Sequence, residues 1–65
     1  MQTFKVGDVV VLEQPYSRYD EAKGSVGHVT RITDGPLGFE QDVYVTFWVN
    51  PSRTPVYSAW RLKPL

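Results

Sequence analysis

The chain of 65 residues contains no cysteine, a single histidine and no excess of charge of either sign. Without cysteine, neither a disulfide nor a thiolate metal site can form, and a zinc site would need carboxylates alone around His28. Seven basic residues balance seven acidic ones. Nucleic-acid binders usually carry a basic excess, because neutralised phosphates supply much of their affinity. These absences disfavour disulfide scaffolds, metal centres and general polyanion binders.

Long apolar runs are absent as well. Residues 1–6 have neither the basic start nor the apolar core of a secretory signal peptide. No apolar run approaches the roughly 20 residues of a membrane-spanning helix. We therefore expect a cytoplasmic protein with no membrane contact. We also expect one domain over residues 1–65, because a chain this short lies near the lower limit at which a single core suffices.

The sequence does contain a series of short β-patterned segments separated by turn residues. We predict strands over residues 9–13, 25–33, 42–49, 54–58 and 62–65. The third is the strongest prediction, because β-branched and aromatic residues alternate along it. A polar loop over residues 14–24 joins the first two strands, and a single 3₁₀ turn over residues 58–61 precedes the last one.

Glycine and proline add detail to this pattern. Gly27 within the second strand predicts either a β-bulge or a close approach of two backbones. The segment Asp34-Gly35-Pro36-Leu37-Gly38 has the composition of a turn. Pro55 cannot donate a backbone hydrogen bond, so the fourth strand is predicted to lie at an edge of the sheet or to begin there.

Three segments carry a resemblance to a known family: Phe4-Lys5-Val6-Gly7-Asp8, Gly24-Ser25-Val26-Gly27-His28-Val29 and Tyr57-Ser58-Ala59-Trp60-Arg61-Leu62-Lys63-Pro64-Leu65. Their pattern resembles that of stand-alone SH3-like proteins of bacteria and phages. It is also similar to the SH3-like subunit of photosystem I, to related subunits of the photosynthetic NDH complex, and to the C-terminal domain of the nitrile hydratase β-subunit. The resemblance implies an all-β fold: a five-stranded SH3-like barrel with a long first loop and a short 3₁₀ turn before the last strand. These relatives share docking to a larger protein without chemistry of their own, so an accessory subunit is implied.

The resemblance also assigns residues to faces of the sheet. In the relatives, the second and fourth residues after the Gly-Asp turn point inward, which implies that Val10 and Leu12 are buried and that Val9 and Val11 face outward. The same alternation in the central strand implies a buried and an outward set: Val43, Val45, Phe47 and Val49 inward, Tyr44, Thr46 and Trp48 outward.

An exposed apolar patch would result if the first and central strands lie near each other. Its members would be Val9, Val11, Tyr44 and Trp48, and contiguous exposed patches usually mark interaction sites. The alternative is that a sheet this small curls until loops cover both faces, in which case the aromatic residues belong to the core.

Residues suited to catalysis are scarce. No second histidine or cysteine is available to activate a serine or cysteine nucleophile. The acidic pair Asp20-Glu21 and the group Asp34, Glu40 and Asp42 lack the spacing of a calcium loop. A barrel of this size also has no room for a closed pocket of the usual ~300 Å³ or more. We therefore expect no enzymatic activity, no cofactor and no metal.

Docking to a protein is the function that the sequence favours. Tyr, Trp and Arg dominate the energetics of interfaces, and several of them lie in the first loop and near the chain's end. The candidate partner-binding residues are Tyr16, Arg18, Tyr19, Tyr44, Trp48, Arg53, Tyr57 and Trp60. For Trp60 the alternative is that it plugs the end of the barrel as a core residue.

Nucleic-acid binding is the alternative function. Tyr44 and Trp48 would stack on bases, while four cations would contact phosphates: Arg31, Arg53, Arg61 and Lys63. A special case of protein docking is pairing of the exposed edge at residues 54–58 with another chain. Through that edge the protein would form a weak homodimer; otherwise we expect a monomer.

Overall fold

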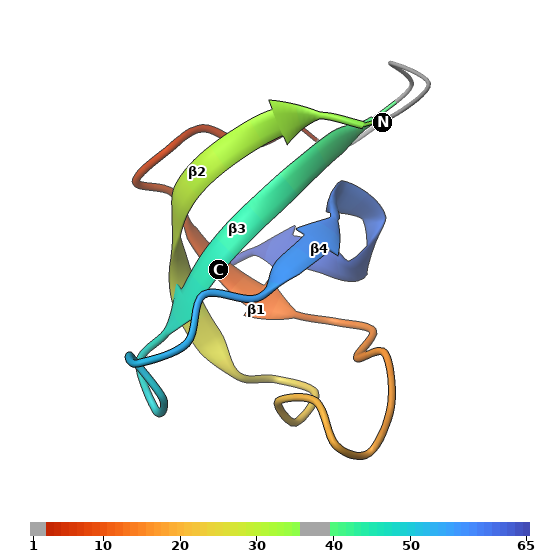
Figure 1. The fold of residues 1–65 in the computed structure, drawn as a ribbon, viewed down its shortest axis with the longest axis vertical. Coiled ribbons are helices and arrows are strands. Elements are labelled where there is room, and N and C mark those ends of the chain that lie inside the picture. The colour runs from red at the N-terminus through yellow and green to blue at the C-terminus, as the bar shows by residue number, and fades with distance from the viewer. Residues whose placement is uncertain (1–2, 36–39) are drawn as a thin grey trace.

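The computed structural model describes residues 3–35 and 40–65, which form an all-β structure (Figure 1). Within these residues there are five strands and one 3₁₀ helix: β1 (Val9–Leu12), β2 (Val26–Asp34), β3 (Gln41–Phe47), β4 (Val56–Ser58), η1 (Ala59–Arg61) and β5 (Leu62–Pro64). The strands pair antiparallel in one sheet, in the order β4-β3-β2-β1-β5. The predicted strands and the 3₁₀ turn before the last strand are confirmed, with ends that shift by at most two residues.

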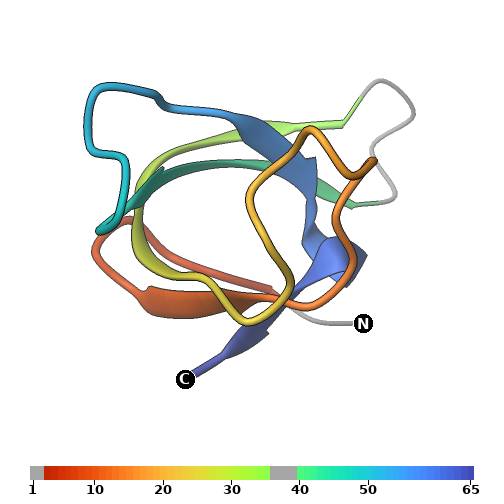
Figure 2. The same cartoon turned by 90° about the horizontal axis from the view of Figure 1, so that it is seen from below.

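The two edges of the sheet lie close together in space. The edge strands β4 and β5 are separated along the chain only by the three residues of η1. A 3₁₀ helix rises about 2 Å per residue, so the sheet must curl to bring its edges within that reach. Figure 2 shows this curl end-on. No ladder joins β4 to β5 within the described residues, so the sheet is strongly curved but is not closed by hydrogen bonds.

The hydrophobic core fills the concave side of the curled sheet. Ten of the described residues form it: Phe4, Val10, Leu12, Val29, Val43, Val45, Phe47, Tyr57, Ala59 and Leu62. The strand alternation produces this pattern directly, since successive side chains point to opposite faces. Val10 and Leu12 are buried as predicted, whereas Val9 and Val11 keep part of their surface exposed.

The prediction that Val49 faces the core is wrong. β3 ends at Phe47, and the backbone N–H of Asn50 donates to the Phe47 carbonyl at 3.1 Å. The chain therefore turns before the alternation reaches Val49, and this side chain is 77% exposed. Trp48 is the first of the two central residues of this turn, and its side chain is exposed, as predicted.

Glycine is required where β2 crosses close to β3. A Cβ atom at Gly27 would collide with the carbonyl oxygen of Thr46 and lie 2.9 Å from the Cα of Phe47. Of the two predicted roles of Gly27, the close backbone approach is therefore the correct one. The register shift of β2 lies further along, between Val29 and Arg31. The predicted turn over residues 34–38 lies mostly outside the described residues.

Candidate functional site

The first loop, residues 13–25, is fastened to the rest of the protein at both ends. At its start, the backbone N–H groups of Glu13 and Gln14 donate to the carbonyl of Arg61, at 2.8 and 3.0 Å. At its end, Gly24 N–H donates to the Leu12 carbonyl at 2.8 Å. The loop therefore lies against η1 rather than extending freely from the sheet.

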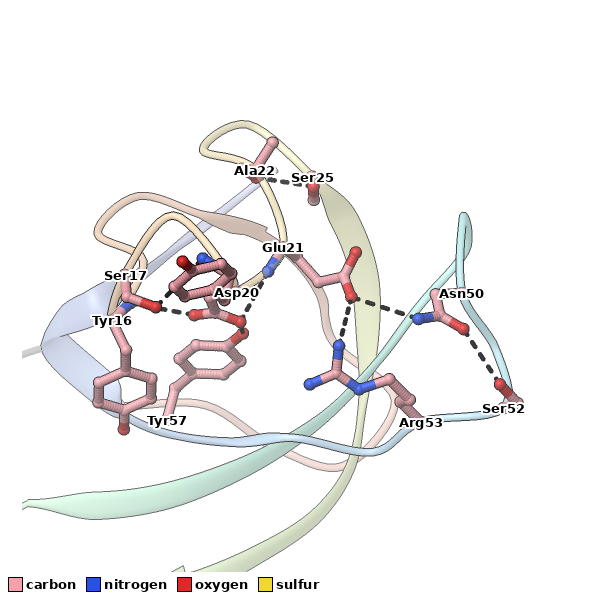
Figure 3. A network of polar contacts seen from close by, with 11 residues as sticks. Tyr16, Ser17, Asp20, Glu21, Ala22, Ser25, Asn50, Ser52, Arg53 and Tyr57 are labelled. Carbon is pink, nitrogen blue, oxygen red and sulfur yellow. Dashed lines mark hydrogen bonds and ion pairs between the residues drawn. The ribbon is translucent and has the colours of Figure 1, made fainter.

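Asp20 connects the middle of the loop to the core (Figure 3). Its Oδ1 accepts hydrogen bonds from the Tyr57 hydroxyl at 2.5 Å and from the Glu21 N–H at 2.7 Å. Its Oδ2 accepts from the Tyr16 N–H at 3.0 Å. Tyr57 is fully buried, and a buried hydroxyl without a partner is costly. The carboxylate of Asp20 thus accepts the hydrogen bond that the buried Tyr57 hydroxyl needs, and it also fixes the loop backbone at Tyr16 and Glu21.

The pKa values of this pair reflect the same contacts. Burial alone would raise the pKa of Asp20, but the hydrogen bonds from Tyr57 and from the backbone of Tyr16 and Glu21, together with the charge of Arg53, bring it below its ordinary value. Burial raises the pKa of the Tyr57 hydroxyl, and the bond to the Asp20 carboxylate raises it further. Asp20 is therefore ionised and Tyr57 protonated at neutral pH, as their hydrogen bond requires.

Four side chains form a layered array that leads from the core to the surface. The ring of Tyr16 stacks on that of Tyr57, with centroids 5.3 Å apart and planes within 10°. The guanidinium carbon of Arg61 lies 4.0 Å from the centroid of Tyr16 and 4.4 Å from that of Trp60. We call Tyr57, Tyr16, Arg61 and Trp60 the aromatic stack. Its inner member is fully buried and its outer member, Trp60, is 50% exposed.

Further bonds hold the aromatic stack in place. The Tyr16 hydroxyl donates to the carbonyl of Val56 in β4 at 3.2 Å. Nη1 of Arg61 donates to the carbonyls of Gln14 and Pro15, at 3.0 and 3.3 Å. The loop, β4 and η1 are thus joined through Tyr16 and Arg61, and the exposed parts of the stack have a defined orientation.

Arg18 and Tyr19 lie at the outer part of the same loop. A turn closed by the Asp20 N–H and the Ser17 carbonyl places them there. The guanidinium of Arg18 lies over the ring of Tyr19, 5.1 Å from its centroid, and its Nη2 donates to the Tyr19 hydroxyl at 3.0 Å. Tyr19 is 79% exposed, so this pair rests on the surface.

Arg53 connects a second turn to the first loop. Its Nη1 lies 3.2 Å from Oε2 of Glu21, and the Asn50 side-chain amide donates to the same carboxylate at 3.4 Å (Figure 3). An exposed ion pair of this kind contributes about 1 kcal/mol or less. The contact places the turn over residues 48–53 beside the loop.

The predicted apolar patch on the outer face of the sheet is only partly formed. β2 lies between β1 and β3, so Val9 and Val11 do not adjoin Trp48 directly. Val26 joins them: it pairs with Val11, and its carbonyl accepts from the Trp48 N–H at 3.0 Å. Val11, Val26 and Trp48 therefore follow one another across the sheet, while Val9 pairs with His28 and lies outside this row.

Tyr44 lies elsewhere on that outer face. The guanidinium of Arg31 lies 5.3 Å from its ring centroid, and Tyr44 is only partly exposed. Tyr44 and Trp48 are four residues apart with Thr46 between them on the same face. Within the described residues, no stacking or cation–π contact joins either of these rings to the aromatic stack.

Two interpretations of single residues need correction. Tyr57 is fully buried, so it supports the docking candidates from below and is not itself available to a partner. Trp60 is half exposed and packs on Arg61, while Ala59 is the buried residue of η1. The alternative in which Trp60 is a core residue is therefore wrong.

Arg61 is the residue whose part in the site the sequence did not indicate. The sequence suggests Arg61 only as a candidate phosphate contact, whereas in the structure its guanidinium packs on both Tyr16 and Trp60. Its neighbour Trp60 was the one available signal, since Arg beside Trp favours a cation–π contact. Nothing in the spacing of the chain relates either residue to Tyr16.

Across the described ranges 3–35 and 40–65, no three His, Cys, Asp or Glu side chains are placed to share a metal ion. In the same ranges no helix is long and apolar enough to cross a membrane. Comparison with family models, with curated proteins and with solved structures found no match to this chain.

Proposed function

We propose that this protein is a non-catalytic binding module that docks onto a larger protein through one side of its fold. The docking surface consists of the exposed and partly exposed side chains of the first loop and η1: Tyr16, Arg18, Tyr19, Trp60 and Arg61. We call it the first-loop surface. The observation that supports it best is the aromatic stack, which holds exposed side chains of the types that dominate interfaces in a fixed orientation. Because their order exists before binding, little conformational entropy is lost when a partner binds.

An SH3-like small barrel is the fold that we propose for this module. Five antiparallel strands in a curled sheet, a long loop between β1 and β2, and a 3₁₀ turn between β4 and β5 support it. A fold of this kind presents loops at its ends while a small core fixes their bases.

Pairing through a sheet edge is less well supported than docking through the first-loop surface. Each edge strand, β4 and β5, is three residues long. The Val56 carbonyl of β4 already accepts from Tyr16, and Pro64 of β5 has no N–H to donate. Short edges with occupied or missing groups are poor templates for another strand.

Nucleic-acid binding is a second candidate, favoured by the contact of Arg31 with Tyr44 and by the exposure of Trp48 on the outer sheet face. Two of the four cations it requires are already paired, Lys63 with Glu13 and Arg53 with Glu21, each at 3.2 Å. A third, Arg61, belongs to the aromatic stack. These pairings reduce the positive charge available to phosphates, so protein docking is the better-supported function.

Capture of partners by matched variants tests the proposal. Tyr19→Ala removes an exposed ring that contacts Arg18 of its own loop, and Trp48→Ala is the control, because it removes an exposed ring outside the first-loop surface. We expect chemical cross-linking in native lysate to recover a protein with the wild type and with Trp48→Ala, but not with Tyr19→Ala. All three should unfold at similar temperatures. Loss of the partner in Trp48→Ala alone would contradict the proposed surface. Salt-sensitive binding of oligonucleotides with no captured protein would favour the second candidate instead.

A further inference from the structure

The guanidinium of Arg61 has hydrogen-bond donors that the fold does not use. Only Nη1 is bonded, to the carbonyls of Gln14 and Pro15. No residue in the described part of the chain accepts from Nη2 or Nε, the other two nitrogens. Among the same residues no side-chain nitrogen or oxygen is both buried and unbonded. Since Arg61 is itself only partly buried, Nη2 and Nε must reach solvent.

Arg61 also has no carboxylate partner within residues 3–35 and 40–65. The ion pairs recorded there are Arg53 with Glu21 and Lys63 with Glu13. Glu13 lies beside Arg61 through its backbone, yet its side chain pairs with Lys63. The charge of Arg61 is therefore held in place by two aromatic rings and two carbonyls, none of which neutralises it.

We propose that Arg61 is the recognition point for a carboxylate of the partner protein, supplied by an Asp or Glu side chain with an apolar residue beside it. The inference rests on the proposed docking function. A guanidinium offers a planar pair of donors that matches the two oxygens of a carboxylate, and here it is oriented in advance. Trp60 packs on this guanidinium and is 50% exposed, and its exposed part would be covered by the apolar neighbour of the acidic residue.

A carboxylate fits this surface better than a phosphate backbone does. A polyanion gains affinity from several cations along its length, whereas the first-loop surface has two arginines. Arg18 lies over Tyr19 within the loop, and only Arg61 is held beside the apolar ring of Trp60. The chain as a whole carries no net charge. A partner segment with one acidic side chain and otherwise apolar contacts fits both the fixed guanidinium beside Trp60 and the absence of net charge.

Arg31 is the natural control for Arg61. It too lies over a tyrosine, Tyr44, at 5.3 Å from the ring centroid, but it is exposed and on the outer face of the sheet. No backbone carbonyl of the described residues accepts from its side chain. Lysine keeps the positive charge at either position, so a purely electrostatic attraction would survive both Arg→Lys substitutions, whereas bidentate recognition of a carboxylate would be lost in Arg61→Lys alone.

A displayed library of random linear peptides, selected against the wild-type protein at physiological salt, is the probe. We expect the selected peptides to share Asp or Glu next to an apolar residue, and to shift the Nε–Hε signal of Arg61 in ¹H–¹⁵N spectra. Replacing that acid by its amide should weaken binding by about tenfold or more, as expected for one charge-assisted hydrogen bond. Arg61→Lys should weaken it similarly, and Arg31→Lys should leave it unchanged. The peptide substitution needs no change in the protein, so it is decisive even if Arg61→Lys alters the fold.

The outcomes separate this inference from the proposed function. Peptides that bind the first-loop surface without an acidic residue, or that tolerate the amide, would overturn the role of Arg61 and leave the docking function standing. If no selected peptide shifts the signals of Tyr16, Tyr19 or Trp60, both proposals fail. If oligonucleotides of mixed sequence shift Arg61 where the acidic peptides do not, the ligand is a nucleic acid and the inference is wrong.

Discussion

Tyr16 and Trp48 are exposed to nearly the same extent, 55% and 57%, but the protein holds them very differently. Tyr16 stacks on a core residue, lies against Arg61, and donates its hydroxyl to a carbonyl of β4. For Trp48 the recorded contact is that of its backbone N–H with Val26, and no stacking or cation–π contact of its ring occurs within the described residues. Exposure alone therefore does not distinguish a docking residue from an unsupported surface residue.

The two side chains differ in whether the folded protein already fixes their orientation before a partner binds. An interface that must fix a freely rotating side chain loses roughly 0.5–1.5 kcal/mol for each one. In the first-loop surface, contacts with Asp20, Tyr57 and the backbone of the loop already fix the side-chain orientation in the folded protein, so this entropy is not lost on binding. At Trp48 and Val49, where β3 has ended, no comparable support exists in the described structure.

Asp20→Ala should destabilise the protein most, by about 3 kcal/mol. The substitution leaves the buried Tyr57 hydroxyl and the N–H groups of Tyr16 and Glu21 without their acceptor. For a domain of this size that is a large share of the roughly 3–10 kcal/mol expected in total. Urea unfolding measures it, with Asp20→Asn as the control that keeps one acceptor oxygen. A loss below about 1 kcal/mol would show that the first loop does not depend on the core.

Acid should weaken the same connection. The pKa of Asp20 lies below the ordinary value of 3.8, so the folded protein binds this proton less readily than the unfolded chain. The stabilisation is therefore fully present above the unfolded pKa and is lost as the pH falls through the lower folded pKa. We expect the melting temperatures of wild type and Asp20→Asn to differ at neutral pH and to converge as the pH falls below 3.8 and through the lower pKa of the folded state. A constant difference across this range would contradict the assignment.

Tyr16→Ala should have an intermediate effect, about 1.5 kcal/mol, because it removes one aromatic contact and one cation–π contact of the stack. Tyr16→Phe keeps the ring and should cost less than about 1 kcal/mol, the value of one exposed hydrogen bond. A double-mutant cycle with Arg61→Ala should show coupling between the two side chains. If the changes in the free energy of unfolding simply add, the two side chains do not stabilise each other.

Trp48→Ala should have the smallest effect on stability, within about 0.5 kcal/mol, as for a surface residue without specific contacts. The same urea measurement applies, with Tyr16→Ala as the direct comparison at equal exposure. If the two substitutions cost the same, the difference in support between the two regions has no energetic meaning.

Much of the fold could be predicted, and the reasons are local. Alternation in residues 42–49 places Val43, Val45 and Phe47 inward, as the structure shows. Alternation does not reveal where β3 ends, which is why it predicts the wrong face for Val49. That boundary depends on the turn closed by the Asn50 N–H and the Phe47 carbonyl, and on where β3 stops pairing with its neighbours in the curled sheet.

The candidate docking residues were predictable by type and not by arrangement. Tyr16, Tyr19 and Trp60 were identified as aromatic residues of a kind enriched at interfaces, and all three are at least half exposed. Tyr57 belongs to the same type, yet the sheet pairs it with Val43 and buries it. The residue type indicates which contacts a side chain can make with a partner, whereas the register of the residue in the sheet decides whether a partner can reach it.

The sequence by itself determined the all-β class, the number and approximate place of the strands, and the 3₁₀ turn before the last of them, because these follow from periodicity and turn chemistry within a few neighbouring residues. Only the tertiary structure decided that Tyr16 and Asp20 meet Tyr57, and that Arg61 lies between Tyr16 and Trp60. Apart from the contact of Arg61 with its neighbour Trp60, those contacts join residues distant along the chain. They form because the curled sheet brings β4, η1 and the first loop to one side of the molecule, a geometry that depends on all five strands at once.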